Sequence, residues 1–133
     1  MSVFKHVIRD NPDFIFTRGE IDSIFDHYYN EFWRETQDVS MFVAMFLNIV
    51  RDFLTHEISE ETLSALINKS LFDERTKQYH YEPYLWSIND VLALLHELLD
   101  VTWTKGSDNY SDYLIDLEAR YTALAEKYQI EVL

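Results

Sequence analysis

The chain has 133 residues, enough for one domain with a sizeable core, and carries 24 Asp and Glu against 11 Lys and Arg, a formal net charge of −13. Its 47% apolar content, with nine Phe, nine Tyr and three Trp, excludes a disordered acidic tail. The absence of cysteine excludes disulfide bonds, cysteine-based zinc sites and thiol catalysis.

Apolar residues recur at helical spacing from Thr17 onward, after an irregular or short-helical lead-in over residues 1–16. Thr17 and Glu20 have the spacing of a capping box, in which each side chain can satisfy a backbone N–H group at the helix start. We therefore expect a first helix from this box to about Thr36. Its apolar stripe consists of Ile21, Ile24, Phe25, Tyr28, Phe32 and Trp33.

The second predicted helix, from about Ser40 to about His56, is apolar on most sides, because 11 of the 14 residues in the run 41–54 are apolar. We expect this helix at the centre of the fold. A membrane span needs about 20 apolar residues, so the run predicts a core helix and not a membrane segment. The N-terminal residues lack the apolar run of a secretion signal, so we expect a soluble, cytoplasmic protein.

Ser59 is the predicted cap of a third helix, with Glu60 and Glu61 in its first turn and a buried stripe of Leu63, Leu66, Ile67, Ser70 and Leu71. The segment 73–86 is rich in Tyr and His and predicts a long loop with room for one helical turn. The residues 87–90 then open a fourth helix, whose inward face consists of Val91, Leu94, Leu95 and Leu98, with Val101 and Thr102 near its end.

Lys105 and Gly106 mark the end of the fourth helix, since a cation in the last turn and a following glycine are common stop signals. The final helix begins between Ser107 and Ser111, and its inward residues are Tyr110, Tyr113, Leu114, Leu117, Tyr121, Leu124 and Tyr128. Two Gly and two Pro are too few turn residues for a many-stranded sheet. The predicted fold class is all-α: a single antiparallel bundle of about five helices, one domain over residues 1–133.

No group of residues has the spacing of a catalytic or metal site. There is no Gly-rich phosphate loop, and the five His form neither His-x-x-x-His nor Glu-x-x-His pairs. The carboxylate pairs Asp22/Asp26 and Asp112/Asp116 have i,i+4 spacing, which suits a cation site, an acid–base pair or a solvated helix face, and we favour the solvated face. We therefore expect no enzymatic activity, no catalytic residue, no metal and no cofactor.

The negative charge repels nucleic acid and membrane phosphates and attracts basic proteins, so we expect a basic protein partner, no nucleic acid and no membrane. No Lys or Arg occurs between Gln78 and Thr104, which excludes a stacking site for single-stranded nucleic acid among the aromatic residues there. These aromatic side chains either close the ends of the bundle or act as interface anchors.

Two segments combine carboxylates with aromatic residues away from the core stripes, and both are candidate partner-binding sites. The first supplies Asp73, Glu74, Tyr81 and Tyr84, and the second supplies Trp103, Asp108, Tyr110, Asp112 and Asp116. We expect no cation to relieve the repulsion within the second segment, which favours a cationic partner. The alternative is structural: acidic residues at a helix start interact favourably with its dipole.

Three helix patterns resemble a known family. They are the junction 53–63, with Phe53-Leu54 followed by Glu57-Ile58-Ser59, the helix 91–99 and the closing helix 117–124. Over about residues 40–130 the chain resembles colicin D-type immunity proteins and the helical immunity proteins of contact-dependent growth inhibition systems. The resemblance implies a non-enzymatic, cytosolic inhibitor that binds a bacteriocin-like nuclease toxin, commonly a tRNase, and occludes its basic active site.

Two other functions agree with the composition. An acidic mimic of nucleic acid, which antagonises a DNA-binding protein, would space its carboxylates like phosphates and compete with duplex DNA. A helical adaptor or subunit would expose an apolar stripe and self-associate. An enzyme is the least favoured reading.

Overall fold

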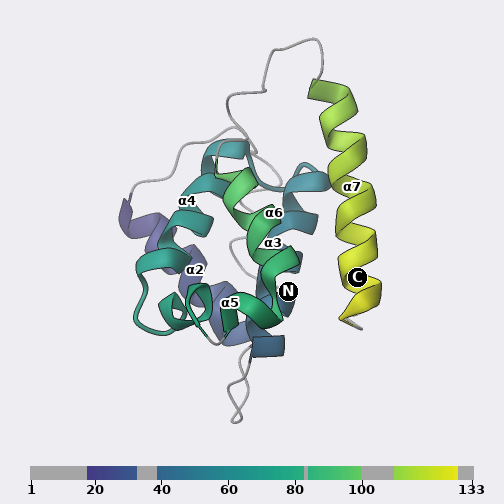
Figure 1. Cartoon of the computed structure of the whole chain (residues 1–133). Coiled ribbons are helices and arrows are strands. Elements are labelled where there is room, and N and C mark those ends of the chain that lie inside the picture. The colour runs from purple at the N-terminus through teal and green to yellow at the C-terminus, as the bar shows by residue number, and fades with distance from the viewer. Residues whose placement is uncertain (1–17, 33–38, 83, 100–109, 129–133) are drawn as a thin grey trace.

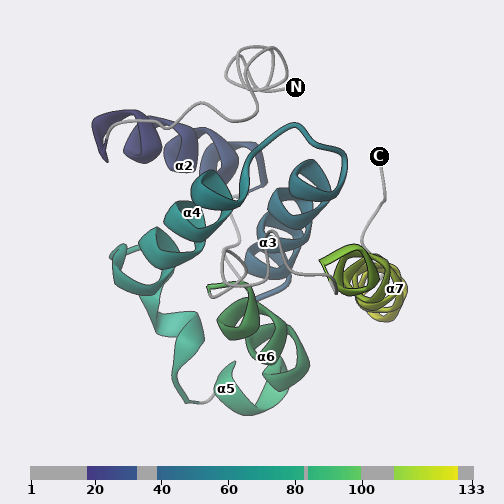
Figure 2. The ribbon, with the colours of Figure 1, turned by 90° about the horizontal axis from the view of Figure 1, so that it is seen from above.

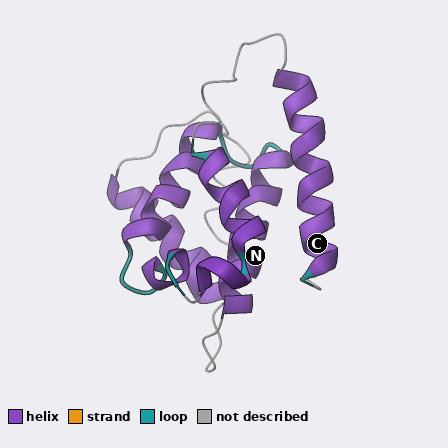
Figure 3. Ribbon diagram, in the orientation of Figure 1, coloured by secondary structure: helices purple, strands orange, loops and turns teal. Residues whose placement is uncertain are grey.

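The computed structural model describes residues 18–32, 39–82, 84–99 and 110–128 (Figure 1). Within these ranges every regular element is helical (Figure 3), so the predicted all-α bundle of about five helices is confirmed. The longer helices are α2 (Arg18–Phe32), α3 (Val39–Leu54), α4 (Glu60–Phe72), α6 (Asn89–Leu98) and α7 (Tyr110–Lys127). Two short elements, the 3-10 helix η1 (Lys77–His80) and α5 (Tyr84–Ser87), connect α4 to α6.

The central helix is α3, which packs against α2, α4 and α7. Seen from above, it lies between α4 and α7 (Figure 2). Most of its residues are buried, as the apolar run 41–54 predicted, because no side of this helix is polar enough to face water. None of the described helices combines the length and apolarity that a membrane-spanning helix needs.

The outer helices follow the predicted stripes closely. The α4 cap forms as expected, since Ser59 Oγ accepts a hydrogen bond from the Thr62 backbone N–H at 3.2 Å. The predicted core residues of α6 are all buried, and in α7 Leu117, Tyr121 and Leu124 are buried. The predictions for residues 1–17, 33–36 and 101–109 fall outside the described residues.

The segment 73–86 differs from the predicted loop, because it contains two short helical elements and contributes to the core. Tyr79 is 1% exposed and stacks on Phe42 with 5.2 Å between ring centroids. Tyr84 packs edge-on against Tyr79 at 4.9 Å. Elements of four residues are too short to show a helical period, so only the aromatic content signalled their burial.

A buried carboxylate joins three parts of the fold. Asp52, 2% exposed, accepts hydrogen bonds from the Tyr28 hydroxyl of α2 and from Arg51 Nη2 at 3.1 Å. Its backbone carbonyl accepts the N–H groups of Glu57 at 2.8 Å and Ile58 at 3.2 Å. Burial, and then the charge of Asp52, raise the pKa of Tyr28 well above its ordinary value, so this hydroxyl remains a donor. Asp52 thus connects α2, the end of α3 and the α3–α4 turn (residues 55–59).

Replacing Asp52 by Ala should lower the free energy of unfolding by about 3 kcal/mol, because the buried Tyr28 hydroxyl loses its acceptor. Asp52→Asn keeps an acceptor for that hydroxyl and should cost about 1 kcal/mol. Urea unfolding followed by circular dichroism measures both. Asp112→Ala, which removes an exposed carboxylate, is the matched control and should stay within about 0.5 kcal/mol of the original protein. Equal stability of the Asp52→Ala and Asp112→Ala variants would contradict this account.

His80 is a buried titratable group in the same core. It is 7% exposed, lies edge-on to Phe42 at 5.3 Å, and has its Nε2 3.4 Å from Ser70 Oγ. Burial, together with the neighbouring His96, lowers the pKa of His80 to about 4. The folded protein therefore keeps this ring neutral at a pH where the unfolded chain already takes up the proton.

The free energy of unfolding should consequently fall as the pH drops from the ordinary histidine value of 6.5 to about 4. His80→Gln cannot titrate, so the stability advantage of the original protein over this variant should shrink by about 2–3 kcal/mol across that window. Urea unfolding of both proteins at a series of pH values measures this difference in stability. The two proteins have the same carboxylates, so the contribution of carboxylate titration cancels in the difference. A difference that stays constant with pH would show that His80 is not held neutral.

Candidate functional site

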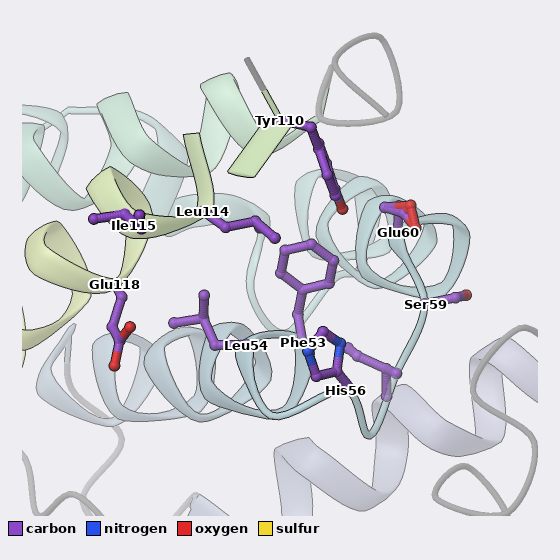
Figure 4. Close-up of a pocket in the computed structure, with 10 residues that line it drawn as sticks. Phe53, Leu54, His56, Ser59, Glu60, Tyr110, Leu114, Ile115 and Glu118 are labelled. Atoms are coloured by element: carbon purple, nitrogen blue, oxygen red, sulfur yellow. The ribbon is translucent and has the colours of Figure 1, made fainter. Parts of the chain in front are cut away.

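A groove of about 390 Å³ lies between the α3–α4 turn and the N-terminal half of α7 (Figure 4). The first side of the groove comes from Phe53, Leu54, His56, Ile58, Ser59 and Glu60, and the second from Tyr110, Leu114, Ile115 and Glu118. In Figure 4, Tyr110 and Leu114 point from α7 toward the Phe53 ring, while the carboxylates of Glu60 and Glu118 lie at opposite ends of the group. The groove therefore combines apolar and polar side chains and has a carboxylate at each end.

The first side of the groove is shaped by the way α3 ends. The N–H of His56 bonds the Phe53 carbonyl at 3.0 Å, and the N–H of Glu57 bonds the Asp52 carbonyl at 2.8 Å. This pair of bonds is a Schellman motif, in which the residue after the cap adopts a left-handed conformation. His56 occupies that position with φ 63°, although glycine is the usual residue there. The turn exposes His56 and buries Ile58 and Ser59.

The second side of the groove exists because the first turns of α7 bury their side chains only in part. All buried residues of α7 lie at Leu117 or beyond. Tyr110, Leu114 and Glu118 follow one another at i,i+4 spacing and share a face of the helix. Ile115 is 68% exposed and adds apolar surface to this part of the helix. The first turns of α7 therefore leave an apolar surface open beside the α3–α4 turn.

Internal ion pairs occupy every Lys and Arg side chain that the structure describes. These pairs are Arg51 with Asp52, Lys69 with Asp22, Arg75 with Asp26 and Asp73, Lys77 with Glu74, Arg120 with Glu97, and Lys127 with Asp90. None of these pairs includes Asp112 or Glu118 on the exposed part of α7. Asp112 and Glu118 are thus not compensated by the described cations.

The four residues of the first predicted segment divide between the fold and the exposed surface. Asp73 is part of the fold: it accepts hydrogen bonds from Arg75 Nε at 2.8 Å and Nη2 at 2.9 Å, and these bonds lower its pKa to about 2. Arg75 also pairs with Asp26 of α2, which connects the two helices. Glu74 is exposed but pairs with Lys77 at 2.9 Å, and Tyr84 packs on the core. Only Tyr81, 64% exposed, is open to a partner.

The second predicted segment contributes one residue directly to the groove, Tyr110, with Asp112 and Asp116 exposed on the same helix. The expectation that no cation relieves the repulsion here is wrong for Asp116, whose carboxylate lies 3.8 Å from Arg120 Nη1. Trp103 and Asp108 lie outside the described residues.

Sequence reasoning missed most of the groove, although its first side lies within the junction 53–63 that carries the family resemblance. The junction was recognised as a helix boundary, not as a surface. The available signal was Ile115, an aliphatic residue outside the inward stripe of the final helix. A second signal is the turn after α3. The sequence has no glycine there, so another residue, His56, takes the left-handed position.

The groove offers a ligand apolar contacts and negative charge more than reactive groups. In the described part of the chain, no group of three or more His, Asp or Glu side chains is arranged to hold a metal ion. Comparisons of the chain with protein-family models, with curated proteins and with solved structures find no match.

The left-handed conformation of His56 gives a stability prediction. His56→Gly should raise the free energy of unfolding by about 1 kcal/mol, because glycine has no Cβ to oppose this conformation. His56→Val should lower it by at least about 1 kcal/mol, since a β-branched residue tolerates positive φ least. Urea unfolding of the three proteins gives the order. A glycine variant less stable than the original protein would contradict the Schellman assignment.

Proposed function

We propose that the protein is a non-enzymatic inhibitor of a basic protein, and that its partner is the nuclease domain of a bacterial toxin, of the tRNase type, for which this chain is the immunity protein. The observation that carries the proposal is the charge balance. Internal pairs already engage the described Lys and Arg side chains, so a net charge of −13 leaves carboxylates such as Asp112 and Glu118 for an external cation. The resemblance over about residues 40–130 supports the same function.

The physical basis is electrostatic complementarity. A ribonuclease holds phosphates with Lys, Arg and His, so its cleft is positive before substrate binds. A rigid helical surface with uncompensated carboxylates is attracted to such a cleft at long range, which speeds association and disfavours partners of the wrong charge. Slow dissociation depends on apolar and aromatic side chains that become buried at the interface, and the surface also offers these.

An adaptor or subunit is the second candidate, favoured by the exposed apolar side chains. Phe72 is 72% exposed and Trp86 is 68% exposed. If these residues form a permanent interface between copies of the chain, the protein self-associates at low concentration without any toxin. Analytical ultracentrifugation detects this self-association, and a binding assay with a basic nuclease separates the two functions, because only the proposed one predicts a complex with the nuclease.

The direct test uses the protein encoded immediately upstream, since immunity genes of this type follow their toxin genes. The purified C-terminal domain of that protein should form a stable complex with this chain and lose its tRNA-cleaving activity. The affinity should fall at least about tenfold between about 50 and 500 mM salt, because screening weakens charge attraction. A chain that forms no complex, or a complex in which tRNA is still cleaved, would contradict the proposal. Displacement of the chain from a DNA-binding protein by duplex DNA would favour the nucleic-acid mimic instead.

A further inference from the structure

The proposed function leaves open which surface meets the partner, and the groove between the α3–α4 turn and α7 differs from the other acidic surfaces. Apolar side chains line its length, namely Phe53, Leu54, Leu114 and Ile115, and carboxylates mark its two ends. A purely charged surface would attract any cation. This combination selects a ligand that offers an apolar side chain and positive charges together.

Ile115 is the most exposed of the apolar side chains that line the groove. At 68% exposure it keeps most of its surface in water, although burying an aliphatic side chain of this size gains free energy. Leu114 and Tyr110 beside it are only partly buried. An aliphatic side chain inserted beside the Phe53 ring would cover all of these residues at once. Such a set of packed apolar contacts, surrounded by polar groups, is typical of binding hot spots.

The charges around the groove define the rest of the ligand. Glu118 is exposed on the rim, one helical turn from Ile115 and without a described Lys or Arg as partner. A Lys or Arg beside the inserted apolar residue would meet this carboxylate, and the water excluded by the apolar contact would strengthen the pairing.

Resting on the proposed function, we propose that this groove is the docking site for an amphipathic basic segment of the toxin domain. One aliphatic side chain of that segment enters between Phe53, Leu114 and Ile115, and a Lys or Arg of the same segment pairs with Glu118. The partner thus binds through apolar contact flanked by charge, and the carboxylates here are not solely mimics of phosphate.

Two pairs of variants test the proposal in the full chain. Glu118→Lys and Glu126→Lys make the same charge change on exposed positions of α7, but only Glu118 lines the groove. Ile115→Asn and Phe72→Asn each remove an exposed apolar side chain, 68% and 72% exposed respectively, but only Ile115 lines the groove. Because all four positions are exposed, the variants should fold, and circular dichroism checks this.

The probe is an amphipathic helical peptide made only of leucine and lysine, with polylysine of the same length as its comparison. The leucine–lysine peptide should bind the original protein at least about tenfold more tightly than polylysine. Glu118→Lys and Ile115→Asn should each weaken it about tenfold or more, whereas Glu126→Lys and Phe72→Asn should change it less than about threefold. Equal binding of the two peptides, or equal losses in groove and control variants, would overturn the proposal.

The same four variants are then tested against the upstream-encoded toxin domain. If the original chain does not bind that domain, the proposed function fails. If the original chain binds and the groove variants bind as well as their controls, the function stands and the docking site is wrong. Loss of toxin binding confined to Glu118→Lys and Ile115→Asn is the result expected from the proposal.

Discussion

The hydrogen bonds of Asp52 are the constraint on which the candidate site depends. Its buried carboxylate is tolerated because the Tyr28 hydroxyl and Arg51 donate to it. Its backbone carbonyl accepts the N–H groups of Glu57 and Ile58, and these backbone bonds determine how α3 ends. The chain then turns through a left-handed residue and enters α4 at the Ser59 cap. One side of the groove therefore follows from the way backbone bonds close the end of α3, while the carboxylate of Asp52 holds that end against α2.

The carboxylates include two groups: those in ion pairs that connect parts of the fold, and those without a described cation as partner. Asp22, Asp26 and Asp73 hold α2 against α4 and the chain that follows it, through Lys69 and Arg75. Arg75 also lies over the Tyr29 ring at 4.3 Å, which adds a cation–π contact to this connection. Asp112 and Glu118 take no part in such pairs. Net charge alone does not distinguish the two groups, but the positions of the few cations do.

The helices were predictable because apolar residues at a spacing of three and four must face a common core. The run 41–54 identified α3 as the central helix, and Ser59 with two following acids identified the start of α4. Asp73 was assigned to a binding surface because its partners, Arg75 and Asp26, lie partly on another helix and no local pattern shows such a pairing. The groove could not be predicted for a related reason. It joins two segments about fifty residues apart in sequence, and no local pattern shows which turns of α7 bury their side chains.

Hydrogen–deuterium exchange of the chain, free and in complex with the upstream-encoded nuclease domain, tests the central claim most directly. The account predicts that binding slows exchange in two segments, residues 53–60 and 110–118, and leaves the exposed face of α6 unchanged. Protection confined to residues 77–87, where Tyr81 and Trp86 are exposed, would place the interface on the aromatic connection instead and contradict the account.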